Sequence, residues 1–143
     1  MSRSNPPGRR VLVVQDEPFT AFSIANVVLE LGHIVVGPAF SWDEARRLAA
    51  TCKMDIALLD AKLQGRFAGE IADICVCRKI PFAFVTGYEE IPFPGYRYVP
   101  LVVKPFVPSA LQRAIDVLLE PCEPFAVAVR TKIVANRGGE VLR

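Results

Sequence analysis

Short apolar segments alternate with segments of helical periodicity along most of the chain. The apolar segments are typical of buried parallel strands; they lie at residues 10–14, 33–36, 54–60, 80–85 and 99–103. Segments with apolar residues at every third or fourth position predict helices; they lie at residues 18–31, 42–52, 68–78 and 109–119. The alternation predicts an α/β fold built on a five-stranded parallel sheet.

Residues that start or stop such elements agree with this pattern. Pro18 suits the first turn of a helix, and Ser41 with Glu44 forms a capping box for the next helix. Pro100, near the start of the last strand, predicts that this strand lies at an edge of the sheet. The first helix is expected to pack through an apolar stripe formed by Phe19, Phe22, Ala25, Val28 and Leu29.

Three stretches are expected to lie outside helices and strands. Gly37 and Pro38 are expected to end the second strand. Residues 61–66 are expected to form a loop. Residues 88–98 contain two prolines and a glycine, so we expect a loop with at most one weak helical turn.

Right-handed connections between parallel strands put helices on both faces of the sheet. We therefore expect residues 10–120 to form one flavodoxin-like, doubly wound (βα)5 domain. Residues 1–9 are expected to be a flexible N-terminal segment. Residues 121–143 are too few for a second domain, and we expect a C-terminal extension that is flexible or contacts a second subunit.

Composition and charge limit the classes of function. The 17 Lys and Arg residues nearly balance the 15 Asp and Glu residues, which gives a net charge of +2 and no electrostatic footprint for nucleic acid. No apolar run reaches the ~20 residues of a membrane span, which favours a cytoplasmic protein. The four cysteines lack the paired spacing of a zinc site.

Polar residues follow four of the predicted strands. Because the carboxyl ends of parallel strands meet at one edge of the sheet, we expect these side chains to lie together. Carboxylates suit Mg2+ and can attack phosphorus, while a Lys ammonium and a Thr hydroxyl can stabilise phosphoryl oxygens. The residues are Gln15, Asp16 and Glu17 after the first strand, Asp60 after the third, Thr86 after the fourth and Lys104 after the fifth.

With these residues the chain resembles the receiver domains of two-component response regulators. The matching segments are Val-Leu-Val-Val-Gln-Asp-Glu-Pro (11–18), Asp-Ile-Ala-Leu-Leu-Asp (55–60), Phe-Val-Thr-Gly-Tyr (84–88) and Val-Val-Lys-Pro-Phe (102–106). Their order and spacing extend the resemblance over about residues 9–120. The third segment is similar to that of single-domain, CheY-like receivers of alphaproteobacteria. The resemblance also implies a cis peptide bond between Lys104 and Pro105.

The resemblance implies a role for each matching residue. Asp60 would be the phosphoacceptor. Asp16 and the backbone carbonyl of Lys62 would join Asp60 in binding Mg2+. Thr86 would hydrogen-bond the phosphoryl group, and Lys104 would pair with one of its oxygens.

The chain departs from the family at two positions. Gln15 stands where the family usually has an acidic residue; an amide carries no negative charge, so we expect weaker Mg2+ binding, with Gln15 contributing weakly or through a metal-bound water. Leu101 stands where many receivers have the Tyr or Phe that moves inward with the Thr.

Two further side chains are expected close to the phosphoryl group. Lys62 lies two residues after the phosphoacceptor and Tyr88 two residues after the Thr, where side chains of the family overhang the acyl phosphate.

These residues predict a signalling switch and not an enzyme. The chain would accept a phosphoryl group on Asp60 from a histidine kinase or phosphotransfer protein and signal through a downstream protein or a second copy of itself. The alternative is a receiver-like interaction module that signals without phosphate, which Gln15 and Leu101 favour. An Asp-nucleophile phosphohydrolase needs an acid where Lys62 stands, and an FMN carrier needs a phosphate-binding loop in place of the acidic residues after the first strand.

Overall fold

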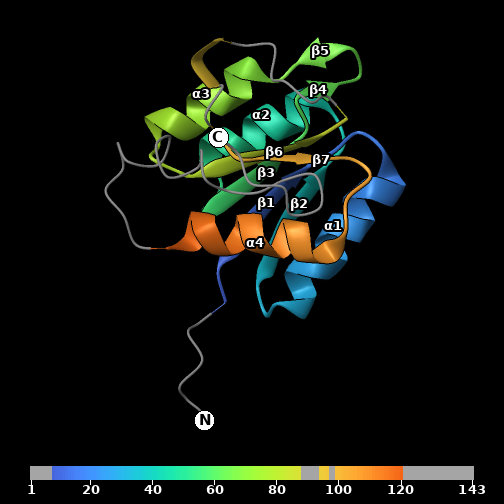
Figure 1. Cartoon of the computed structure of the whole chain (residues 1–143). Helices are drawn as coiled ribbons and strands as arrows, with labels where there is room; N and C mark the ends of the chain where they lie inside the picture. Colours follow the sequence, from blue (N-terminus) through green and yellow to red (C-terminus); the bar gives the residue numbers. More distant parts are fainter. Residues whose placement is uncertain (1–7, 88–93, 97–98, 121–143) are drawn as a thin grey trace.

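A computed structural model describes residues 8–87, 94–96 and 99–120. Within these residues a five-stranded parallel sheet lies between two layers of helices (Figure 1). The predicted C-terminal extension, almost all of the predicted N-terminal segment and most of the predicted 88–98 loop lie outside the described residues.

All neighbouring strands of the sheet are parallel, in the order β2-β1-β3-β6-β7. Every residue of β3 and β6 is buried, as expected for parallel strands covered on both faces. β7 lies at an edge, as Pro100 predicted. The predicted doubly wound fold is confirmed. The strands are β1 (Arg10–Val14), β2 (Ile34–Ala39), β3 (Ile56–Leu59), β6 (Phe82–Thr86) and β7 (Leu101–Val103).

Four described helices cover this sheet, two on each face (Figure 1). They are α1 (Pro18–Glu30), α2 (Trp42–Thr51), α3 (Gly69–Cys77) and α4 (Pro108–Leu119). α1 and α4 pack together on one face, and α2 and α3 pack together on the other. The predicted cap of α2 is present, because the Ser41 hydroxyl accepts the backbone N–H of Glu44 at 3.2 Å. None of the described helices is long and apolar enough to cross a membrane.

The inward face of α1 differs from the predicted stripe. Ala21, Ile24, Ala25 and Val28 are buried, at the spacing of one helix face. Phe19, Phe22 and Leu29 are exposed instead. Phe22 and Leu29 each follow a buried position by one residue, which turns them about 100° around the helix axis. The prediction is confirmed for Ala25 and Val28 and was wrong for the three large residues, because small and branched residues pack against the sheet.

β2 is longer than predicted, because Gly37 and Pro38 continue the strand as far as Ala39. The strand lies at an edge, where the missing N–H of a proline leaves no ladder hydrogen bond unmade. Gly37 has a φ of +94°, and a Cβ there would lie 2.8 Å from the backbone nitrogen of Ala39, so the irregular pairing next to it requires glycine. The Gly37–Pro38 and Lys104–Pro105 peptide bonds are both cis.

The predicted loop at residues 61–66 contains a hairpin of two short antiparallel strands, β4 (Lys62–Leu63) and β5 (Arg66–Phe67). Gln64 and Gly65 form its two-residue turn with φ values of +50° and +84°. Positive φ at both positions is the requirement of a type I′ turn. The sequence prediction missed the hairpin because the usual signal is Asn-Gly or Asp-Gly, and glutamine rarely adopts positive φ.

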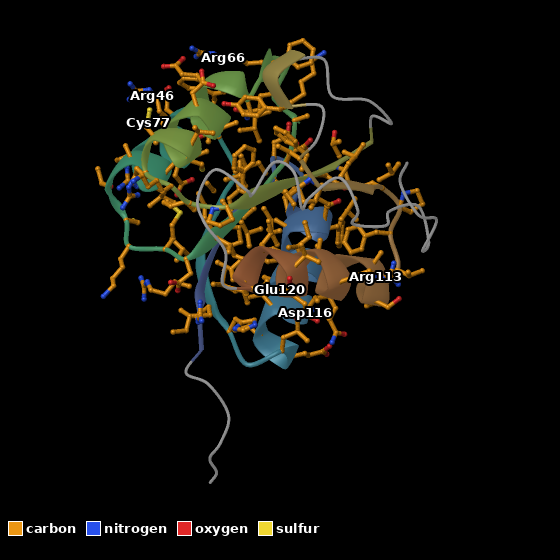
Figure 2. The ribbon with its side chains drawn as sticks, turned by 60° about the vertical axis from the view of Figure 1, so that its left-hand side comes forward. Arg46, Arg66, Cys77, Arg113, Asp116 and Glu120 are labelled. Atoms are coloured by element: carbon orange, nitrogen blue, oxygen red, sulfur yellow. The ribbon has the colours of Figure 1, made fainter. Side chains whose placement is uncertain are left out.

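Polar contacts attach the hairpin to the helices beside it. The guanidinium of Arg66 lies 3.4 Å from the centre of the Trp42 ring, a cation–π arrangement. The indole N–H of Trp42 donates to the carbonyl of Phe67 at 3.4 Å. Arg46 of α2 and Arg66 both pair with Glu70 of α3, and Figure 2 shows the two arginines at the same end of the molecule.

Candidate functional site

Residues from three separate strands meet at the carboxyl edge of the sheet. Asp60 follows β3, Thr86 ends β6, and Lys104 follows β7. The ammonium nitrogen of Lys104 lies 3.3 Å from Oδ2 of Asp60 and 3.2 Å from Oε1 of Gln15, the residue after β1. The arrangement brings four sequence-predicted site residues together.

Asp60 is an almost fully buried carboxylate, with 5% of its surface exposed. Burial raises its pKa above the ordinary value, and the facing Lys104 ammonium partly offsets this effect. Hydrogen bonds from the backbone N–H of Lys62 and from the Thr86 hydroxyl also lower this pKa. The carboxylate therefore remains beside three donors in an interior that excludes most water.

The β4–β5 hairpin supplies a backbone donor to each of the two site carboxylates. Ala68 donates to the Ala61 carbonyl at 2.8 Å, so the next pair, Lys62 with Phe67, is the pair without ladder hydrogen bonds. The backbone N–H of Lys62 therefore points away from β5 and donates to Oδ1 of Asp60 at 3.3 Å.

In the turn that follows β4, the backbone N–H of Gln64 donates to Oδ2 of Asp16 at 2.7 Å. This contact places Asp16, from the loop after β1, against the tip of the hairpin. No local sequence signal connects residues 48 positions apart, so sequence reasoning missed both the contact and the role of the hairpin as a wall of the site.

These groups fit a hard divalent cation in number and chemistry. Asp16 and Asp60 supply carboxylate oxygens, and the Lys62 carbonyl shares the outward edge of β4 with the N–H that reaches Asp60. Mg2+ usually takes one or two carboxylates and keeps several waters. Among the described residues no group of three or more His, Cys, Asp or Glu side chains is placed to hold a metal ion.

Two side chains that were expected near the acyl phosphate lie elsewhere or outside the described residues. The Lys62 ammonium lies 5.2 Å from the centre of the Phe67 ring, and so leans toward β5. Tyr88 is outside the described residues. Leu101 is buried and pairs with Phe84 on the neighbouring strand.

Three aromatic rings, two from β6 and one from the turn before β7, pack together. Tyr96, in the short 3-10 turn η1 (Pro94–Tyr96), packs edge-on against Phe82 and Phe84 at ring distances of 5.5 and 6.3 Å. Its hydroxyl donates to Asp73 of α3. Burial is the main factor that raises the pKa of Tyr96, and the Asp73 hydrogen bond adds to it. This packing differs from the sequence prediction, which assigned Tyr96 to a loop surface or a partner-facing surface.

The comparisons with known proteins agree with this architecture. No protein-family model matches the chain. A curated relative, the phyllosphere-induced regulator PhyR of Methylorubrum extorquens, is 32% identical over 111 residues, which are 74% of this chain and 42% of the relative. The transcriptional regulatory protein PdtaR of Mycobacterium tuberculosis is 30% identical over 57% of this chain and 40% of its own length. The chain thus spans about two fifths of these relatives.

A solved structure matches over nearly its whole length. The response regulator REC domain of Erythrobacter litoralis PhyR is 30% identical and superposes with a TM-score of 0.71 over 82% of this chain and 97% of that domain. The resemblance noted from the four sequence motifs is confirmed. This chain belongs to the family of response-regulator receiver domains.

Proposed function

We propose that this receiver is a phosphorylation switch in which Asp60 accepts a phosphoryl group from a histidine kinase or phosphotransfer protein. The observation that carries the proposal is the buried Asp60 carboxylate, with Lys104 at 3.3 Å and Thr86 as a second hydrogen-bond donor. A buried carboxylate that faces an ammonium and a hydroxyl from other strands is suited to form and hold an acyl phosphate.

The transfer needs a nucleophile and donors for the transferred oxygens. An Asp60 oxygen attacks phosphorus while the bond from phosphorus to the donor imidazole nitrogen breaks, and the electron pair stays on that nitrogen. Lys104 then neutralises one phosphoryl oxygen and the Thr86 hydroxyl donates to another. The burial of Asp60 makes these interactions stronger than they would be in water.

Mg2+ is the proposed cofactor, and when bound it supplies further neutralisation of the phosphoryl oxygens. The proposed ligands are the Asp16 and Asp60 carboxylates and the backbone carbonyl of Lys62. Gln15 already accepts a hydrogen bond from Lys104; its second lone pair is the only one left for a metal-bound water. The affinity for Mg2+ should therefore be lower than with an acid at this position.

The remaining parts of the proposal concern organisation and partners. Residues 10–120 form the receiver domain, with residues 1–9 and 121–143 as flanking segments. The switch acts in the cytoplasm through a downstream protein or a second copy of the chain, and has no catalytic turnover beyond its own phosphorylation and dephosphorylation.

A further solved structure similar to this chain is a PhyR mutant from Bartonella quintana, which is described as an anti-anti-sigma factor; the chain covers 47% of it. An anti-sigma factor is accordingly one candidate for the downstream protein.

Incubation with acetyl phosphate and Mg2+ tests the proposal. We expect intact-mass spectrometry to detect one added phosphoryl group in the wild type and none in Asp60→Asn. Asp116→Asn is the matched control, because Asp116 is exposed on α4 (Figure 2), and it should be labelled as fully as the wild type. A wild type that stays unlabelled at saturating Mg2+ would reject the proposal and favour the interaction module that signals without phosphate.

A further inference from the structure

Gln15 is a completely buried amide, with 0% of its surface exposed, and both ends of its side chain are hydrogen-bonded. Its Nε2 donates to the carbonyl of Val85 in β6 at 2.9 Å. Its Oε1 accepts from the ammonium of Lys104 at 3.2 Å. The side chain therefore links β1 to β6 and to the residue after β7.

The two contacts fix the direction of the amide. The reverse orientation would face the amide oxygen to the Val85 carbonyl and the NH2 group to the Lys104 ammonium, which pairs two acceptors and two donors. Glutamate could not replace this contact, because an ionised carboxylate has no hydrogen to donate to the Val85 carbonyl. Gln15 is thus the residue type that can satisfy both neighbours.

Lys104 lies between Gln15 and Asp60, at 3.2 and 3.3 Å from their oxygens. Its side chain is 24% exposed, so a free ammonium could leave the site and hydrate. Its hydrogen bonds to these two acceptors hold it in place. One of them, Gln15, cannot move without losing its bond to β6.

We propose that Gln15 is a positioning residue that holds the Lys104 ammonium against Asp60 before any metal binds. This inference rests on the proposed function of Asp60 as phosphoacceptor. Gln15 also sets the charge of the site: Asp16, Asp60 and Lys104 sum to a formal charge of −1 (two carboxylates and one ammonium), whereas an acid at position 15 would make it −2. The chain thus combines a preformed Lys104–Asp60 pair with a weaker attraction for divalent cations.

The first experiment follows the Lys104 ammonium by nitrogen-15 NMR without metal or phosphodonor, with the signal assigned through Lys104→Met. Gln15→Met replaces the amide by an apolar side chain of similar length, and we expect hydrogen exchange of the Lys104 ammonium to become about tenfold faster. Gln112→Met, at an exposed position of α4, is the matched control and should leave the exchange rate unchanged. Because no phosphoryl group is involved, this readout is independent of whether Asp60 is an acceptor.

The second experiment titrates Mg2+ and follows the fluorescence of Trp42, the single tryptophan. Gln15→Glu adds a charge at the site and should lower the half-saturating Mg2+ concentration roughly tenfold. With acetyl phosphate at saturating Mg2+, Gln15→Met should be labelled about tenfold more slowly than wild type.

Two results would overturn the inference. Unchanged ammonium exchange and labelling rate in a folded Gln15→Met protein would make Gln15 a packing residue only. Should that variant fail to fold, Gln15→Glu decides, because an unchanged Mg2+ half-saturation would show that the amide does not set the charge of the site. A wild type that cannot be labelled but has a slowly exchanging Lys104 would reject the phosphorylation proposal and leave the positioning role in place.

Discussion

Replacing Phe84 with Ala is expected to lower the free energy of unfolding by about 3–5 kcal/mol. Phe84 is fully buried in the middle of β6, and its ring packs edge-on against Phe82 and Tyr96. The substitution removes these contacts and leaves a cavity in the core on the face of the sheet that α2 and α3 cover. Since domains of this kind are stable by roughly 5–15 kcal/mol, the loss is a large share of the total.

Denaturant unfolding measures this effect, and Phe19→Ala is its control. Phe19 has the same side chain but is 83% exposed on α1, so the change should lie within about 0.5 kcal/mol. Similar losses for the two variants would contradict the packing described for α1 and β6.

Replacing Lys104 with Met is expected to slow phosphorylation by acetyl phosphate on the order of 10²-fold, the usual effect of losing one donor to a developing oxyanion. The ammonium also lowers the pKa of Asp60, so without it this pKa should rise further above its ordinary value. The pH at which half of the maximal labelling rate is reached should therefore shift upward. Labelling rates measured across pH test both expectations.

Lys62→Met is the matched control for Lys104→Met. It removes the same charge two residues from Asp60, but the Lys62 ammonium lies over the Phe67 ring and only its backbone N–H reaches Asp60. Its labelling rate and pH profile should stay close to wild type. Equal defects in the two variants would indicate a general effect of positive charge at this edge instead of a specific role for Lys104.

Periodicity and turn residues predicted the strands and their edge because burial on both faces selects continuous apolar runs. They could not predict which face of α1 lies inward. The sequence around α1 is apolar on more than one side, and only the shape of the sheet surface decides that Ala21 and Ala25 pack while Phe19 and Leu29 stay exposed.

The sequence predicted the site residues that follow strands, but it did not predict the backbone groups that the hairpin contributes. Asp60, Thr86 and Lys104 follow strands, and parallel topology brings such positions together. The N–H groups of Lys62 and Gln64 depend instead on a type I′ turn that the sequence does not signal. The sequence identified Gln15 as a departure from the family, but its bonds to Val85 and Lys104 required coordinates.

The most direct test of the central claim locates the phosphoryl group in the chain. Borohydride reduces an acyl phosphate and converts the phosphorylated Asp to homoserine, which peptide mass spectrometry can assign to one position. After acetyl phosphate and Mg2+, we predict homoserine at Asp60 and unmodified residues at Asp16 and Asp55. Homoserine at either of those residues, or none anywhere in the chain, would contradict the account.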